Sequence, residues 1–413
     1  MPDIRTALVI GAGITGIAAA EWLRRDGVAV TVIDRTAPGD PNQTSFGNAG
    51  LLARSAVLPL SEPGMLLASA RMVFDPNSPL FLRWTHLPRL APWLLRFFGS
   101  GRHDRMMRGV DALTSIVTDA VDQHAALAAG TDAARFIQRG PYAYMFRNRA
   151  EYDRHRLDWD MRRRAGFRVT ELEGAALAAH DANLSDRYGF AAMLEDHGWL
   201  GDPGAYVAAL AGHFQDNGGK ILTGDVTEIA AGRVTLADGQ RFGADRIILA
   251  TGAWSDALTR QRGLRTLVEP ERGYHLFLTG PSFQPAHPFM VAEAHCVLTP
   301  MDKGLRVAGI SEWGGFSRKK SPGPLDLLKK RLKQVYPTLT WKAEETWLGF
   351  RPTTPDSLPH IGSPKDDPSI ICAFGAQHIG LTLGPRMGRL AADIATGRKP
   401  NLDLTPFRPD RFS

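Results

Sequence analysis

The alternation of apolar and polar positions predicts that the chain opens with a β-α-β unit. Residues 7–10 form an apolar run typical of a buried strand, and glycines and a helix through Arg25 follow. Gly27 stands just past the helix, where a left-handed residue ends it. A second strand at 28–33 closes on Asp34. This order predicts an α/β domain with a parallel sheet.

Later segments divide between two kinds of pattern. Residues 36–50 are rich in Pro, Gly, Asn and Ser and predict a long loop, whereas 60–135 carry a mostly helical pattern. Apolar runs at 246–250 and 369–374 show no polar alternation, which is typical of strands buried in a parallel sheet. Further helices are expected at 151–166, 203–217, 325–336 and 385–396, and further strands at 142–146, 190–194, 220–222, 225–229 and 233–236.

A last group of strands, at 274–278, 296–300 and 305–310, indicates an antiparallel sheet. A turn at 302–304 joins the last two directly, as in a β-hairpin. We therefore expect two domains built from interleaved segments. The α/β domain comprises 1–55, 196–262 and 341–413, and the antiparallel domain comprises 56–195 and 263–340.

Composition adds charge and compartment to this picture. The 413 residues are 44% hydrophobic and 22% charged, and the formal net charge is +6. This mild excess favours an anionic ligand, but no long basic run appears, and the densest clusters, at 162–164 and 318–320, are typical of solvated faces. We therefore expect no nucleic acid partner. Cys296 and Cys372 form neither a metal nor a redox spacing, so we expect no metal and a cytoplasmic location.

The stretch 80–98 is the nearest approach to a membrane segment. Three arginines, a histidine and two prolines interrupt it, so it is too polar to span a bilayer. Its Trp and Phe residues beside arginines suit either a membrane surface or a helix packed on its own domain. Peripheral contact with the inner face of the cell membrane therefore stays an alternative, without a transmembrane segment.

The glycines after the first strand form a dinucleotide-binding fingerprint, GAGITG at 11–16. Gly11 makes a tight turn, Gly13 lets the backbone approach a pyrophosphate, and Gly16 permits close contact between helix and strand. The helix N-terminus offers free amides to phosphates. Asp34 has the spacing of an acid that binds a ribose 2′-hydroxyl, and it would repel the 2′-phosphate of NADP. The fingerprint alone does not choose between FAD and NAD.

Four further motifs make that choice by resemblance. They are TSFGNAG at 44–50, IILATGAWS at 247–255, GFRPTTPD at 349–356 and FGAQHIGLT at 374–382. In this order and over the whole length, they resemble the D-amino acid dehydrogenase branch of the D-amino acid oxidase family. The resemblance implies a Rossmann-like FAD-binding domain interleaved with an antiparallel-sheet substrate domain. The form of the last motif is closer to relatives that act on cyclic substrates such as hydroxy-D-proline.

The resemblance also implies which residues hold the cofactor. The loop at 45–50 would lie along the isoalloxazine, Val226 would contact the adenine through its backbone, and the last helix would point its N-terminus at the flavin. No residue matches a tethering site, so we expect FAD to bind without a covalent bond. The expected FAD-binding residues are Gly11, Gly13, Ile14, Thr15, Gly16, Asp34, Arg35, Ser45, Asn48, Ala49, Gly50, Leu51, Val226, Ala250, Thr251, Gly252, Trp254, Gly375, His378, Ile379, Gly380, Leu381 and Thr382.

Three residues are candidates for contact with the substrate. Arg351 stands where the family holds the substrate carboxylate, and a guanidinium gives a planar two-bond fork, although a structural ion pair is the alternative. Tyr274 would either bind the carboxylate and shape the pocket or sit in the core, and His275 alternates to the opposite face. His378 departs from the family pattern. It would contact a ring hydroxyl or the amine, or else pack and cap.

The resemblance implies oxidative deamination of a small D-amino or imino acid in amino acid catabolism, with a D-alanine-like or D-proline-like substrate. Hydride would pass from Cα to flavin N5, and the electrons would pass to a quinone or other carrier. A glycine- or sarcosine-type oxidase that uses oxygen is one alternative, and an NAD-linked dehydrogenase is another. An RNA-modifying or non-catalytic flavoprotein would need a basic surface with aromatic residues, which the sequence does not show.

Overall fold

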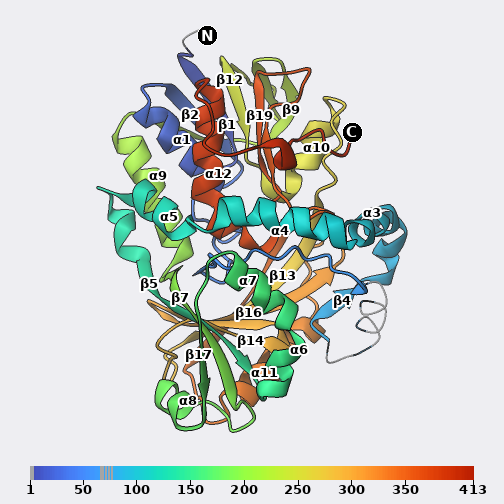
Figure 1. Ribbon diagram of the computed structural model, residues 1–413. Helices are drawn as coiled ribbons and strands as arrows, with labels where there is room; N and C mark the ends of the chain where they lie inside the picture. The colour runs from blue at the N-terminus through green and yellow to red at the C-terminus, as the bar shows by residue number, and fades with distance from the viewer. Residues whose placement is uncertain (1–3, 66–68, 70–71, 73–74, 76–77) are drawn as a thin grey trace.

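The computed structural model describes residues 4–65, 69, 72, 75 and 78–413. Within these residues the strands form three sheets, which we call sheet A (six strands), sheet B (ten strands) and sheet C (three strands). Figure 1 shows two halves, with sheet A and both termini at one end and sheet B at the other. The predicted combination of an α/β half with an antiparallel half is confirmed.

Sheet A is the predicted parallel sheet. Its strands, in spatial order, are β18 (His360–Gly362), β19 (Ile370–Phe374), β12 (Arg246–Leu249), β1 (Thr6–Ile10), β2 (Ala29–Asp34) and β8 (Lys220–Thr223). All neighbours run parallel except β18, which pairs antiparallel with β19. Parallel strands need crossover connections, and helices supply several of them here.

Both faces of sheet A are covered, which explains its uninterrupted apolar strands. On one face lie α1 (Ile14–Arg25), α9 (Pro203–Asp216) and α12 (Gly380–Ala395) (Figure 1). Val9 and Ile248 of the sheet are buried there with Ile17 of α1. On the other face sheet C packs, formed by β11 (Arg241–Gly243), β10 (Arg233–Leu236) and β9 (Val226–Ala230). Ile229 and Val234 are buried in that second cluster.

Sheet B is mostly antiparallel. Its strands, in spatial order, are β17 (Ala343–Thr353), β13 (Glu269–Thr279), β16 (Gly304–Trp313), β15 (Cys296–Met301), β14 (Phe289–Val291), β5 (Ile137–Phe146), β7 (Phe190–Leu200) and β3 (Leu51–Leu52), with β4 (Leu80–Leu82) beside β16 and β6 (Val169–Glu173) beside β7. The pairs β14–β5 and β16–β4 run parallel. One face packs on α11 (Pro322–Val335), and the other faces the α/β half.

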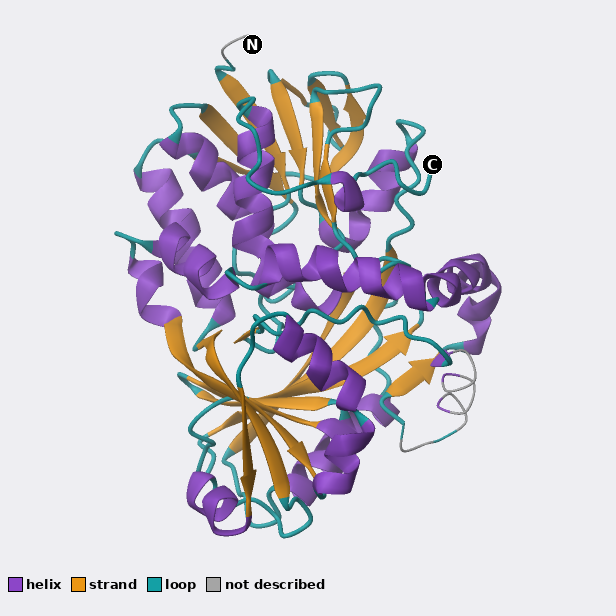
Figure 2. Ribbon diagram, viewed as in Figure 1, coloured by secondary structure: helices purple, strands orange, loops and turns teal. Residues whose placement is uncertain are grey.

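The remaining helices lie around the junction of the two halves and along sheet B, except α10 (Ser255–Arg260), which lies in the α/β half near the C-terminus (Figure 1 and Figure 2). The others are α3 (Leu87–Ser100), α4 (His103–Val117), α5 (Ala120–Ala128), α6 (Arg149–Arg154), α7 (Arg156–Arg164) and α8 (Gly174–His180). The helical pattern predicted over 60–135 corresponds to α3, α4 and α5, and most of its part at 66–77 lies outside the described residues. The helix predicted at 151–166 is two helices that meet at His155.

The last helix begins five residues earlier than predicted, at Gly380, with Pro385 in its interior. A proline lacks the N–H that would donate to the carbonyl four residues before it, which is that of Leu381. His124 of α5 replaces this donor, because its Nε2 lies 2.9 Å from the Leu381 carbonyl oxygen. Tertiary structure thus satisfies a carbonyl that the sequence left without a helical partner.

Strand β17 was not predicted. It pairs with β13 from Ala343 to Thr353, so it belongs to sheet B although the sequence-based division groups it with the α/β domain. The same holds for residues 196–200 of β7 and for β3. Residues 343–347 are largely polar and carry no two-residue alternation, which left β17 without a sequence signal.

Candidate active site

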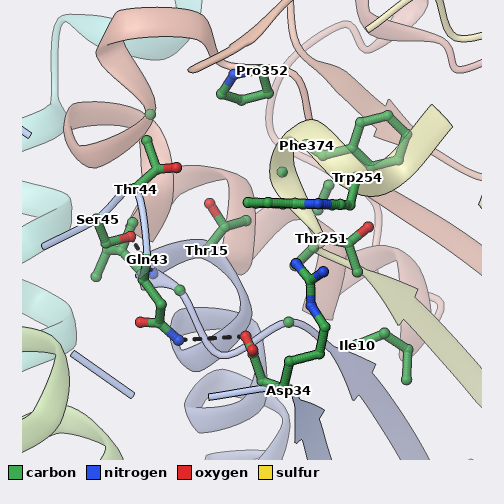
Figure 3. Close-up of a pocket in the computed structure, with 18 of the residues that line it drawn as sticks. Ile10, Thr15, Asp34, Gln43, Thr44, Ser45, Thr251, Trp254, Pro352 and Phe374 are labelled. Atoms are coloured by element: carbon green, nitrogen blue, oxygen red, sulfur yellow. Dashed lines mark hydrogen bonds between the residues drawn. The ribbon is translucent and has the colours of Figure 1, made fainter. Parts of the chain in front are cut away.

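The first cavity, of about 650 Å³, lies beyond the carboxyl ends of β1, β2, β12 and β19 (Figure 3). Open α/β sheets bind ligands at this edge. Expected cofactor residues that line it are Gly11, Gly13, Ile14, Thr15, Asp34, Arg35, Ser45, Asn48, Val226, Ala250, Thr251, Gly252, Trp254, Gly375, Gly380 and Leu381. Segments far apart in the sequence therefore meet in one elongated cavity.

The fingerprint glycines are required by close backbone contacts. Gly11 has φ +106°, and a Cβ there would lie 2.4 Å from the Ala250 carbonyl oxygen. A Cβ at Gly16 would lie 1.8 Å from the Gly11 carbonyl oxygen. Gly16 is not among the residues that line the cavity, and its role is the close packing of α1 that the fingerprint predicts.

Polar side chains fix the loop that follows β2. The Asp34 carboxylate accepts hydrogen bonds from the Ala12 N–H (2.6 Å) and the Thr36 N–H (3.0 Å). Gln43 points its amide toward the same carboxylate (Figure 3). Ser45 Oγ accepts the Ile14 N–H at 3.1 Å, at the N-terminus of α1. These bonds hold the loop against the helix end that would face the phosphates.

The loop after β16 borders this cavity, which the sequence did not predict. The loop after β16 carries Phe316, which stacks on Trp254 with ring centroids 5.3 Å apart. The Arg35 guanidinium lies 4.4 Å from the centroid of the same Trp254 ring. Arg318 of this loop lines the cavity and donates to Asn42. The basic cluster at 318–320 is therefore not simply a solvated face.

A second cavity, of about 670 Å³, adjoins the first and shares Thr44, Asn48 and Gln377 with it. It lies between the 44–51 loop, one face of sheet B, β4, α3 and the segment that leads into α12. Expected residues that line it are Ala49, Leu51, His378, Ile379, Thr382, Tyr274 and Arg351. Gly50 lines neither cavity. It has φ +83°, and a Cβ there would lie 2.7 Å from Met301 Cε.

Arg351 lies on the wall of the second cavity and is held from one side. Its Nη1 donates to Glu271 Oε1 (2.6 Å) and to Ser311 Oγ (2.8 Å). Glu271 is buried and also accepts hydrogen bonds from Ser311 and Thr353. Within the described part of the chain, Nη1 is the only Arg351 atom with such partners, so Nε and Nη2 keep their donors available.

The charge of this pair is set by its surroundings. Burial raises the pKa of the Glu271 carboxyl, but the Arg351 charge and the hydrogen bonds from Ser311, Arg351 and Thr353 together lower the pKa below its ordinary value. Glu271 is therefore ionised at neutral pH. The ion pair that the sequence left as an alternative for Arg351 does exist, and it orients the guanidinium rather than enclosing it.

Glycine at position 273 makes room for this arrangement. Laterally paired residues of neighbouring strands point to the same face of a sheet, and Glu271, Gly273 and His275 share the face that carries Arg351. A Cβ at Gly273 would lie 2.7 Å from Arg351 Nε and 2.9 Å from Cζ. The guanidinium therefore lies flat over the backbone of β13.

Tyr274 points the other way. Tyr274 lies on the face of β13 opposite to Glu271 and is 1% exposed in the core shared with α11, so it borders the second cavity without turning its hydroxyl toward it. Its hydroxyl donates to Glu312 (2.5 Å) and accepts from Arg272 (2.8 Å). Of the two roles left open by the sequence, the core position is the one observed, and a carboxylate contact by the phenol is corrected. The predicted alternation with His275 holds.

His378 borders the second cavity between the two halves of the site. The residue is exposed and lines the cavity, while desolvation by the surrounding protein and the nearby Arg351 charge lower the pKa of His378. The ring is therefore neutral at pH 7. Its carbonyl oxygen accepts a hydrogen bond from Asn48 Nδ2 at 3.1 Å, which joins the 44–50 loop to the approach of α12.

Sheet B supports the 44–50 loop through Arg306 and His275, to which the sequence assigned no such role. Arg306 is buried and donates from Nη1 to the carbonyl oxygens of Phe46 (3.0 Å) and Asn48 (2.6 Å). His275 Nδ1 donates to the Gly47 carbonyl oxygen at 2.9 Å and stacks on Trp347. The loop conformation thus depends on strands β13, β16 and β17, which no local sequence pattern reveals.

The donors and shapes of the first cavity fit FAD. The α1 N-terminus, whose N-cap Gly13 provides no side-chain hydrogen bond, leaves amides for a pyrophosphate. Asp34 ends β2 where a ribose would lie, and Val226 lines the cavity where its backbone would contact an adenine. Helix α12 begins at the junction of the two cavities, where a flavin ring would bridge them.

A family profile described as FAD dependent oxidoreductase matches residues 6–394. The chain belongs to this family. It is 34% identical over 421 residues to a D-amino-acid oxidase of Bradyrhizobium diazoefficiens, with 100% of both chains covered. It is 30% identical over 407 residues to a D-amino acid dehydrogenase of Methylobacterium nodulans, with 96% of both chains covered. The predicted family, FAD dependence and oxidoreductase class are confirmed.

Solved structures agree on the fold. A glycine oxidase from Geobacillus kaustophilus superposes with a TM-score of 0.74 at 20% identity, covering 99% of this chain and 100% of that one. An L-proline dehydrogenase from P. horikoshii superposes with a TM-score of 0.70 at 18% identity, covering 100% and 98%. No helix in the described part of the FAD-dependent oxidoreductase is long and apolar enough to cross a membrane. Its described residues include no cluster of three His, Cys, Asp or Glu side chains suited to a metal ion.

Proposed function

We propose that this FAD-dependent oxidoreductase catalyses the oxidative deamination of a D-amino or imino acid. The observation that carries this proposal is the position of Arg351. Its guanidinium, fixed by Glu271 and Ser311, lies on the wall of a cavity that adjoins the cofactor cavity. A planar cation with two free donors suits a carboxylate, and its orientation would place the α-carbon toward the shared part of the two cavities.

The chain's own residues would bind and orient the substrate. Bound FAD supplies the two-electron oxidant. Arg351 would hold the carboxylate through Nε and Nη2, while Glu271 keeps the guanidinium plane fixed. His378 is neutral and would face the substrate amine without repelling it. Catalysis would then depend on position and on exclusion of water rather than on a strong base.

The D configuration and the electron acceptor are the finer parts of the proposal. The named D-amino-acid oxidase and D-amino acid dehydrogenases among the relatives support D substrates. For this chain, similarity to proteins named dehydrogenase supports a quinone or another carrier as the acceptor, and similarity to one named oxidase supports oxygen. A comparison of oxygen uptake with reduction of a soluble quinone, at equal substrate concentration, separates the two.

The first test is anaerobic reduction of the enzyme-bound flavin. The purified holoenzyme is mixed with D-amino acids, cis-4-hydroxy-D-proline, glycine, sarcosine and the matching L-amino acids, and the flavin absorbance is followed. We expect D compounds to bleach the flavin and their L enantiomers to leave it oxidised. Bleaching by glycine, sarcosine or L compounds alone would contradict the proposal.

The second test is substitution of Arg351. We expect Arg351→Ala to lower kcat/KM at least about 30-fold, the factor that corresponds to about 2 kcal/mol for a lost charged partner. Arg351→Lys keeps the charge but not the planar fork, so it should lie between the wild type and the alanine variant. FAD content, measured by absorbance, serves as the control for folding. An unchanged kcat/KM in both variants would remove Arg351 from the site.

A further inference from the structure

The second cavity continues past Arg351 along sheet B. Arg351 pairs laterally with Glu271, Glu271 with Trp313, and Trp313 with Leu82. Paired residues point to one face and successive strands are about 4.8 Å apart, so Trp313 and Leu82 lie roughly 10 and 14 Å from Arg351 across the same face. The surface that begins with a cation therefore becomes apolar within two strands.

Helix α3 packs on Trp313 and extends this apolar half of the cavity. Leu90, Trp93 and Phe97 are buried and form one cluster with Trp313 and Leu82. The rings of Trp93 and Phe97 stack with centroids 5.2 Å apart, and Trp93 meets Trp313 at 4.9 Å. Trp93 Nε1 donates to the Leu267 carbonyl oxygen at 2.8 Å, so the indole is fixed and its one polar atom is satisfied.

Among the residues that the structure describes, charge lies at one end of the cavity. Among the lining residues that the structure describes, Glu271 and Arg351 are the only ones with an acidic or basic charge at pH 7, and they pair with each other. A charged substrate side chain would have to leave water without gaining a partner, which is costly. The apolar half therefore disfavours acidic and basic side chains and favours long hydrocarbon or aromatic ones.

We propose that the apolar half formed by Leu82, Trp313 and Trp93 selects amino acids with a large uncharged side chain, aromatic or long aliphatic. This inference rests on the proposed function, because it needs the substrate carboxylate on Arg351. It departs from the small substrate that the sequence motifs imply. Those motifs lie on the cofactor and carboxylate side, whereas residues 80–98 form the far wall and carry no family motif.

The substrate series that tests it runs through D-alanine, D-2-aminobutyrate, D-norvaline, D-norleucine and D-phenylalanine, with D-glutamate and D-lysine as charged comparisons. Because a buried methylene group contributes about 0.8 kcal/mol, we expect kcat/KM to rise about fourfold per added methylene. D-glutamate and D-lysine should fall well below D-norleucine. A series that peaks at D-alanine would overturn the inference and leave the proposed function standing.

Substitutions at Trp313 and Leu82 test whether the apolar half causes the preference for large side chains. Trp313→Ala should lower kcat/KM for D-phenylalanine at least tenfold and change that for D-alanine little, and Leu82→Phe, which narrows the cavity, should shift preference toward small substrates. Leu95→Ala is the matched control, because Leu95 lies on α3 with 77% of its surface exposed, outside the cavity lining. Equal losses for D-phenylalanine and D-alanine in the first two variants would overturn the inference.

A binding measurement separates this inference from the proposed reaction. Acetate, butyrate and hexanoate are titrated into the oxidised holoenzyme, and the shift of the flavin spectrum gives each dissociation constant without turnover. We expect affinity to rise with chain length in the wild type and less so in Leu82→Phe. If no amino acid reduces the flavin, the proposed function fails, and this titration alone tests whether the apolar half binds long uncharged chains. Equal affinity for the three carboxylates would overturn the inference.

Discussion

At the scale of single residues, the site depends on what surrounds Arg351 as much as on Arg351 itself. Buried Glu271 and Thr353 form a hydrogen-bonded group with Ser311 that fixes one edge of the guanidinium and leaves the other edge free. Glycine at 273 lets the guanidinium lie against the backbone. An arginine that is oriented before the substrate arrives loses less entropy on binding than one that moves freely.

Gly273→Ala tests this arrangement. The new Cβ would lie 2.7 Å from Arg351 Nε, so the guanidinium would have to shift and lose a hydrogen bond to Glu271 or Ser311. We expect KM for the substrate to rise roughly tenfold, the factor for about 1.4 kcal/mol, which is the order of one such bond. The melting temperature and FAD content should stay near those of the wild type. An unchanged KM would mean that the guanidinium does not need its observed position.

At the scale of elements, the contact between α1 and α12 positions the N-termini of both helices at the cofactor cavity. A Cβ at Gly388 of α12 would lie 2.6 Å from the backbone nitrogen of Ala19, and one at Gly384 would lie 2.6 Å from Ile14 Cγ2. The two helices therefore approach so closely that only glycine fits at these two positions. This close approach brings the fingerprint end of α1 and the N-terminus of α12 to the same cavity.

Gly388→Ala should separate these helices. Because the clash is with backbone rather than with a flexible side chain, we expect destabilisation of about 1–3 kcal/mol and a weaker affinity for FAD. The measurements are thermal unfolding and FAD fluorescence during dilution. Gly212→Ala in α9 is the matched control, since a Cβ there meets nothing within 4 Å, and helix propensity predicts a small gain in stability. Equal behaviour of the two variants would contradict the close-contact account.

At the scale of the whole molecule, buried neutral histidines join segments that are distant in sequence. His124 links α5 to the Leu381 carbonyl, His197 links β7 to Ser55, and His360 links β18 to the Thr266 carbonyl. Burial lowers the pKa of His124 and of His197 to about 4. The folded protein therefore holds these rings uncharged in a pH range where the unfolded chain would protonate them.

Acidification should consequently destabilise the fold. The folded pKa of His124 lies below the unfolded value of 6.5, so the unfolded state binds more protons below that pH, and stability present above pH 6.5 is lost as pH falls toward 4. For a single histidine the loss reaches about 2 kcal/mol at pH 5. Melting temperatures at pH 7.5 and 5 should differ less in His124→Gln than in the wild type. His103→Gln, at an exposed position of α4, is the control and should leave the difference unchanged.

The sequence by itself determined the cofactor side of this protein. The fingerprint at 11–16, Asp34 and the strand ends at 246–250 and 369–374 lie within an α/β unit whose individual strands and turns follow from short-range patterns. Such a unit repeats the same local rule, a buried strand followed by a turn and a helix, so residues can be assigned to the cavity from their place in the chain. The position of Arg351 also followed from its motif, although not the strand that carries it.

Only the tertiary structure decided the substrate side. The partners of Arg351 come from β13 and β16, the supports of the 44–50 loop from Arg306 and His275, and the apolar wall from β4 and α3. Tyr274 faces the core because strand pairing, not residue type, sets which face of β13 meets the cavity. Pairing between strands as distant in sequence as β4 and β16, in which Leu80 pairs with Ser311, depends on packing of the whole chain, and no local pattern encodes it.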